Sequence, residues 1–145
     1  MYYPDRIVST LDIRFRTEGN TLVITQINTV TLYVSDQDKA REFYVGQLGF
    51  QVRKDEDMGP MGRWLEVAPE AAQTAFVLAN AAAFGKQDRI AASADLVLHT
   101  DDVAGLHQRL AAAGVPVTEP EAQAWGTFVK ITDPDGLEFV VSQPR

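Results

Sequence analysis

Few side chains in this sequence could carry out chemistry, and histidine is the scarcest of them. The chain has two histidines and no cysteine, so disulfides, thiolate catalysis and cysteine-bound zinc are excluded. His99 is the candidate base, since it lies four residues after Asp95 in a stretch of alternating residues. No nucleophile or evident acid adjoins it in sequence, which favours ligand binding or a hydrogen bond over catalysis. His107 receives no role, and the catalytic residues stay unassigned.

The elements that position these residues come from two similar halves of the chain. Asp36 and Asp102 each follow a strand-like run, and they are 66 positions apart. Gly49 and Gly114 each end an amphipathic segment, and they are 65 positions apart. A strand–helix unit that recurs at a nearly constant offset predicts a duplicated half-domain. A working surface is then expected where the two copies meet.

The sequence divides into four parts on this basis. They are an N-terminal extension over 1–23 with a short hairpin, a first module over 24–80, a linker over 81–94 and a second module over 95–145. A second hypothesis for the extension is that translation starts at Val23. The expected elements are a strand over 29–34, a helix over 37–48, strands over 50–54, 63–68 and 74–78, a strand over 95–100, a helix over 103–113, and a hairpin of strands 127–132 and 137–142. The loop over 58–62 is expected to be irregular.

Five short segments occur in an order that resembles one known superfamily. They are Val34-Ser-Asp36, Ala40-x-x-Phe43-Tyr44, Leu48-Gly49-Phe50, His99-Thr-Asp-Asp102, and Asp133-Pro-Asp-Gly136 followed by Glu138-Phe-Val140. Together with the duplication they resemble the vicinal oxygen chelate superfamily of glyoxalases, bleomycin resistance proteins and extradiol dioxygenases, over about residues 24–143. The resemblance implies an α+β fold. Two repeated β-α-β-β-β modules would form a curved mixed sheet, closed into a cup, with the helices outside.

The resemblance also locates the positions where metal-dependent members carry their ligands. Those members place histidine, glutamine or glutamate at four inward positions, which match Thr29, Val77, Asp95 and Val140. Valine cannot bind a metal and a threonine hydroxyl is a poor ligand, so only Asp95 fits. A catalytic ion needs about three protein ligands. Asp95 with Glu66 and Glu138 is the remaining acidic alternative, and we predict no metal and no other cofactor.

Strand alternation predicts which side chains line the cup. Val30, Leu32 and Val34 are expected to face the helices, which leaves the alternate residues facing the cup. The candidate ligand-binding residues are Thr29, Tyr33, Trp64, Glu66, Asp95, His99, Trp125, Phe128 and Lys130. The aromatic residues have a structural alternative as core or dimer-seam side chains. Lys130 either pairs with Glu66 across the sheet or, as the only cation expected to face the cup, holds an anionic group.

Three interpretations of function stay open. The first, which we favour, is a metal-independent binding protein similar to bleomycin resistance proteins, with a small molecule held in an aromatic and acidic cup. A planar cation could stack on Trp64 or Trp125 beside Asp95. The second is an enzyme of the same superfamily, a lyase, isomerase or dioxygenase, with a non-standard or absent metal site. The third is a subunit whose cup is an interaction surface.

Composition restricts the partners and the compartment. The 145 residues predict one domain, with a net charge of −7 and a pI near 4.7. This charge repels phosphate backbones and anionic membranes, so we predict no nucleic-acid and no membrane partner. No long apolar run or signal peptide is evident, which favours the cytoplasm. The resemblance implies a homodimer that completes two cups.

Overall fold

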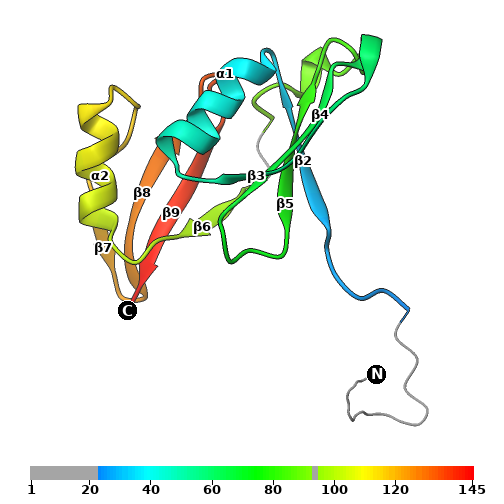
Figure 1. Cartoon of the computed structure of the whole chain (residues 1–145). Helices are drawn as coiled ribbons and strands as arrows, with labels where there is room; N and C mark the ends of the chain where they lie inside the picture. Colours follow the sequence, from blue (N-terminus) through cyan, green and yellow to red (C-terminus); the bar gives the residue numbers. More distant parts are fainter. Residues whose placement is uncertain (1–22, 93–94) are drawn as a thin grey trace, which may run out of the picture.

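The computed structural model describes residues 23–92 and 95–145, which form two four-stranded sheets (Figure 1). The first comes from β2 (Thr29–Val34), α1 (Gln37–Arg41), π-helix η1 (Glu42–Gln47), β3 (Gln51–Asp57), 3₁₀ helix η2 (Gly59–Met61), β4 (Arg63–Ala68) and β5 (Ala75–Asn80). The second follows η3 (Gln87–Arg89) and comprises β6 (Val97–His99), α2 (Val103–Ala112), β7 (Glu121–Gln123), β8 (Gly126–Thr132) and β9 (Glu138–Pro144). The hairpin predicted within 1–23 lies outside the described residues, apart from Val23.

The two sheets share one topology. Their strand orders are β2-β5-β4-β3 and β6-β9-β8-β7, so the first strand of each module pairs with the last. That pairing is parallel in both sheets, and the other neighbours are antiparallel. The duplicated β-α-β-β-β fold predicted from the sequence is confirmed, with one separate sheet in each module.

Both helices begin and end as the repeat predicts. Asp36 accepts hydrogen bonds from the amides of Asp38 and Lys39 at 2.9 and 3.1 Å, which satisfies donors that the first helical turn leaves free. Asp102 accepts one from Gly105 at 3.0 Å. Gly49 and Gly114 both have a φ of +80°, the left-handed conformation in which glycine ends a helix at little cost.

The first helix differs from the regular helix expected over 37–48. It is α-helical only to Arg41 and continues as the π-helix η1. The Leu48 amide donates to the Phe43 carbonyl at 3.0 Å, which is the wider five-residue spacing of a π-turn. Phe43 and its neighbour Tyr44 are both buried in this segment. The apolar stripe of the sequence does not distinguish this wider helix from an α-helix.

One hydrophobic core joins the two modules, and Tyr44 lies at its centre. Its ring is 5.9 Å from that of Phe76 in the first module and 6.2 Å from that of Phe139 in the second. Its hydroxyl donates to Asp133 at 2.9 Å. Burial raises the pKa of Tyr44, so the hydroxyl keeps its proton. The helix-facing sides of both sheets therefore pack into a shared core.

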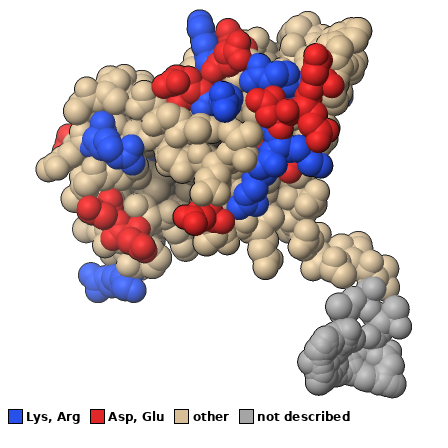
Figure 2. Space-filling view, viewed as in Figure 1, with Lys and Arg blue, Asp and Glu red and all other residues tan. Residues whose placement is uncertain are grey.

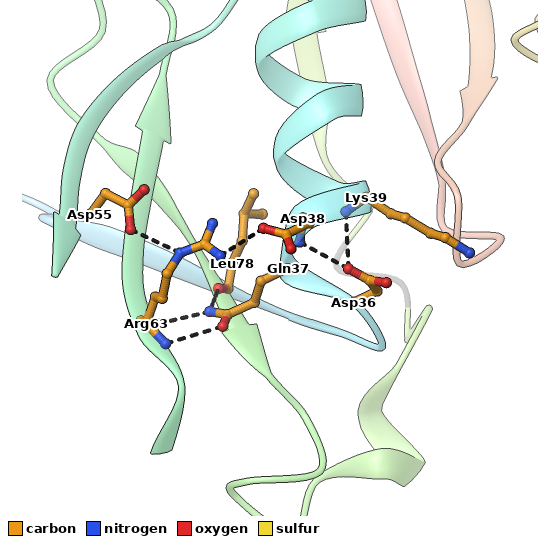
Figure 3. A network of polar contacts seen from close by, with 7 residues as sticks. All are labelled: Asp36, Gln37, Asp38, Lys39, Asp55, Arg63 and Leu78. Carbon is orange, nitrogen blue, oxygen red and sulfur yellow. Dashed lines mark hydrogen bonds and ion pairs between the residues drawn. The ribbon is translucent and has the colours of Figure 1, made fainter. Parts of the chain in front are cut away.

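A polar network attaches the start of α1 to the first sheet (Figure 3). Gln37 is buried, and its amide donates to the carbonyls of Arg63 and Leu78 at 2.7 and 2.8 Å. The Gln37 side-chain oxygen accepts from the Arg63 amide at 3.1 Å. The Arg63 guanidinium contacts Asp38 and Asp55 at 2.7 and 2.9 Å. The hydrogen bonds of the buried Gln37 fix the orientation of α1 over β4 and β5.

Several elements differ in extent from the prediction, and three of the differences are informative. The strand expected over 50–54 extends to Asp57, because its charged end pairs with β4 as an exposed edge strand. Asp95 has a φ of +52°, so the strand expected to start there begins at Val97. The loop over 58–62 contains the short helix η2. No helix within 23–92 or 95–145 is long and apolar enough to cross a membrane.

Candidate functional site

Each sheet has an outer face, which we define as the face turned away from the helices and the shared core. Leu32 and Val34 are buried in the core, whereas Thr31 and Tyr33 lie on the outer face and are more exposed. In β6 the residues Val97 and His99 are exposed on that face. The alternation predicted from the sequence is confirmed on both first strands.

The outer face of the first sheet is closed by its own side chains. Val77 and Ala79 of the central strand β5 are only 2% and 6% exposed, although they face away from the helices. Trp64 on the neighbouring β4 donates its indole N–H to the Glu66 carboxylate at 2.7 Å. Tyr33 on the other side lies 5.8 Å beneath the Arg89 guanidinium of the linker. These large side chains leave little of the central strand accessible.

Two expectations about charge change with this geometry. Glu66 does not pair with Lys130, because β4 and β8 lie in different sheets and Glu66 is hydrogen-bonded to Trp64. Lys130 is also not alone as a cation on an outer face, since Arg89 lies over Tyr33. Sequence analysis missed Arg89 because the linker has no periodicity that could place it.

The outer face of the second sheet is open. A cavity of about 440 Å³ is lined by Ala91, Asp95, Leu96, Val97, Lys130, Gly136, Glu138, Phe139 and Val140. Val97 is 59% exposed, which is unusual for a valine within a sheet. Of the predicted ligand-binding residues, this cavity brings together Asp95 and Lys130. Val97, Glu138 and Val140 join them.

The remaining predicted residues lie elsewhere on the two faces. Phe128 and His99 flank Ser142 in the next row of the second sheet, and Trp125 stacks on Phe128 with ring centres 5.6 Å apart. Trp125 is 55% exposed and forms an aromatic shelf at the rim. Thr29 is half-buried on the first sheet, opposite Ala75. The structure thus divides the predicted residues between two faces.

The geometry also tests the metal ligands that the resemblance implies. Val77 and Val140 occupy two of the four positions, and their side chains carry no donor atom. Within residues 23–92 and 95–145, no three His, Asp or Glu side chains are grouped closely enough to hold an ion. The described residues therefore do not fit the usual metal of metal-dependent relatives.

One buried carboxylate lies at the junction of the modules rather than on an outer face. Asp133 accepts hydrogen bonds from the amides of Asp135 and Leu137 at 2.9 and 2.8 Å, besides that from Tyr44. Burial raises the pKa of Asp133, and these hydrogen bonds only partly offset the effect. All its contacts are structural, so we assign it to the junction.

Comparison with known proteins agrees with this fold. The family model described as Glyoxalase/Bleomycin resistance protein/Dioxygenase superfamily matches residues 26–141, and the chain belongs to this superfamily. YetH, an uncharacterised protein of Bacillus subtilis (strain 168), is 38% identical over 122 residues, 83% of this chain and 100% of that protein. TnmS3, an antibiotic binding protein from Streptomyces sp. CB03234, is 35% identical with a TM-score of 0.75, over 86% of this chain and 100% of that one. A superfamily member from Sphaerobacter thermophilus DSM 20745 is 31% identical with a TM-score of 0.76, over 84% and 99%.

Proposed function

We propose that this protein binds a small organic molecule on the outer face of its second sheet. The observation that carries the proposal is the cavity of about 440 Å³ there, which exposes Val97 beside Lys130 and Glu138. Small-molecule pockets of roughly 300–1,000 Å³ combine apolar walls with a few polar groups in this way. The 35% identity to an antibiotic binding protein supports a function of the same kind.

The ligand class that we propose is a planar aromatic cation. Among the charged residues that line the cavity, Asp95 and Glu138 outnumber Lys130. The Trp125–Phe128 stack adds an aromatic surface on the same face. A cation gains from both features, because it is attracted to aromatic faces and forms charge-assisted hydrogen bonds with carboxylates. The net charge of −7 favours the same sign of ligand.

Titration of the intrinsic tryptophan fluorescence with proflavine, a planar cation, tests this ligand class. Anthracene-2-carboxylate serves as the planar anion of similar size. We expect saturable quenching by proflavine that weakens in Glu138→Gln and is unchanged in Glu56→Gln, an exposed position on the first sheet. Saturation with the anion but not with proflavine would show that the ligand class is wrong.

We also propose that binding requires no metal, in line with the missing donors at Val77 and Val140. The test is thermal unfolding of chelator-treated protein with manganese, iron(II), cobalt, nickel or zinc. An ion that binds the folded state at a hundredfold excess over its dissociation constant adds about 2.7 kcal/mol. A selective rise in the midpoint with one ion, lost in Asp95→Ala, would instead support the enzyme interpretation.

We further propose that the protein is a homodimer located in the cytoplasm. The exposed apolar side chains of Val97 and Trp125 on one face favour a second copy that covers the cavity. We expect sedimentation at micromolar concentration to give twice the monomer mass, and fractionation of host cells to place the protein in the cytoplasm. A monomer in sedimentation would contradict the proposal that a second copy covers the cavity.

A further inference from the structure

A second cavity lies between the two modules, on the core side of the second sheet, opposite the face of the proposed site. Its volume is about 270 Å³, and we call it the seam cavity. It is lined by Leu48, Gly49, Phe50, Pro69, Glu70, Leu98, His99, Thr100, Leu106, Arg109, Ile131 and Val141. The surface is hollowed between the region over α2 and the first sheet (Figure 2). Phe50, Ile131 and Val141 are at most 8% exposed, so the floor is apolar and buried.

Hydrogen bonds hold the first-module wall of the seam cavity in place. Arg53 donates to the carbonyls of Pro69, Glu70 and Ala72 at 2.8, 3.2 and 2.8 Å, which fixes the turn between β4 and β5. Gly49, at a φ of +80°, turns the chain from η1 towards β3 without a side chain. The wall is therefore a built part of the fold.

Groups of opposite charge lie at the exposed rim of the seam cavity. Arg109 on α2 donates to the Gln47 carbonyl at 2.8 Å, which positions its guanidinium across the junction of the modules. The Glu70 carboxylate forms no hydrogen bond or ion pair with any residue that the structure describes. A ligand at this rim meets a cation and an anion.

We propose that the seam cavity binds a small apolar α-amino acid. Its carboxylate would pair with Arg109, its ammonium group with Glu70, and its side chain would lie on the apolar floor. A ligand that carries both charges would form a charge-assisted hydrogen bond with each of the two rim groups. The cavity volume of about 270 Å³ leaves room for a ligand the size of leucine. This site is independent of the ligand proposed for the outer face.

Calorimetric titration with L-leucine, isoamylamine and 4-methylpentanoate tests the proposal, since the two analogues each lack one charged group. We expect saturable leucine binding, at least tenfold tighter than that of either analogue. Arg109→Gln and Glu70→Gln should each weaken leucine binding at least tenfold. Both positions are exposed, so these variants should fold. Arg41→Gln, an exposed position that does not line the cavity, should bind leucine like the wild type.

Several results would overturn this inference. They are an absence of saturable leucine binding, equal affinity for either analogue, or the same affinity in Arg109→Gln and Arg41→Gln. Proflavine titration of the same variants keeps the two sites apart. We expect proflavine binding to be unchanged in Arg109→Gln, so failure at one site says nothing against the other.

Discussion

The outer faces of the two sheets have the same register, but the central strand is covered in the first sheet and partly open in the second. In the first sheet Val77 lies between Thr31 and Glu66, and in the second Val140 lies between Val97 and Lys130. Val77 is 2% exposed, whereas Val140, at the matching position, is partly exposed. Thr31 and Val97, on the flanking first strands, are exposed in both sheets.

The difference shows that the two modules share a backbone fold, whereas their side chains determine which outer face is accessible to a ligand. On the first face, the Trp64 indole donates a hydrogen bond to Glu66, and the Arg89 guanidinium lies over the Tyr33 ring. These side chains therefore interact with one another. The residue of the second sheet at the position equivalent to Trp64 is Phe128. It has no hydrogen-bond donor, and its ring stacks with that of the exposed Trp125. The open face is therefore where a ligand has most to gain.

The sharpest test places a charge on each face. Val77→Asp buries an unpaired carboxylate, so we expect the free energy of unfolding to fall by roughly 3–5 kcal/mol. Val97→Asp, on the face that a single chain leaves open, should change it by less than about 0.5 kcal/mol when unfolding is measured at a protein concentration at which the chain is monomeric. Urea unfolding followed by circular dichroism measures both. Equal losses in the two variants would show that the second face is as closed as the first.

Substitutions at Asp133 test how much its hydrogen bonds at the junction of the two modules contribute to stability. Asp133→Ala leaves the Tyr44 hydroxyl and two backbone amides without their acceptor, which should cost roughly 2–4 kcal/mol. Asp133→Asn keeps an acceptor oxygen and should remain within about 1 kcal/mol of the wild type. Chemical denaturation at pH 7 compares the two, and similar losses would argue against a hydrogen-bonding role.

We also expect the stability difference between the wild type and Asp133→Asn to depend on pH. Because burial raises the pKa of Asp133, the folded wild type takes up a proton there before the unfolded chain does. The wild type should therefore gain stability relative to Asp133→Asn as the pH falls from neutral, with the full gain below the ordinary pKa of 3.8. Unfolding of both proteins across this range measures the difference. A constant difference would mean that the pKa is not raised.

The two tryptophans allow a smaller, matched test, since there is one on each face. Trp64→Phe leaves the half-buried Glu66 without its donor and should lower the free energy of unfolding by about 1 kcal/mol. Trp125→Phe should cost less than about 0.5 kcal/mol but weaken proflavine binding. Thermal unfolding and the fluorescence titration separate these effects. Weaker proflavine binding in Trp64→Phe and a larger stability loss in Trp125→Phe would mean that the ligand binds to the first sheet instead of the second.

The smallest expected effect concerns the linker. Arg89→Ala removes the cation above Tyr33, and we expect a loss of about 0.5 kcal/mol. Arg89→Lys should retain part of it, which distinguishes the cation from the bulk of the side chain. A loss above about 2 kcal/mol in thermal unfolding would mean that Arg89 supports more than this contact.

Local signals in the sequence predicted the frame of this fold well. Asp36 and Asp102 as helix caps, and Gly49 and Gly114 as helix ends, depend on interactions within a few residues. The Asp133-Pro-Asp-Gly136 segment has the proline and glycine typical of a type I turn, and the Gly136 amide donates to the Asp133 carbonyl at 3.0 Å. Face alternation on the first strand of each module follows from strand geometry alone.

The contacts between modules could not be predicted in this way. Tyr44 and Asp133 are 89 residues apart, and no periodicity links them. Of the two alternatives for Lys130, the pairing with Glu66 does not occur, because alternation gives the face of a side chain but not the sheet in which it lies. The π-helix after Arg41 fits the same apolar stripe as an α-helix, so its wider turn was missed.

Amide chemical shifts of nitrogen-15-labelled protein, recorded during titration with proflavine, test the central claim most directly. We predict saturable shifts concentrated at Val97, Lys130 and Val140, on the open face of the second sheet. Shifts at Thr31, Glu66 and Val77 should be smaller. Shifts confined to the first sheet, or none that saturate, would contradict the account.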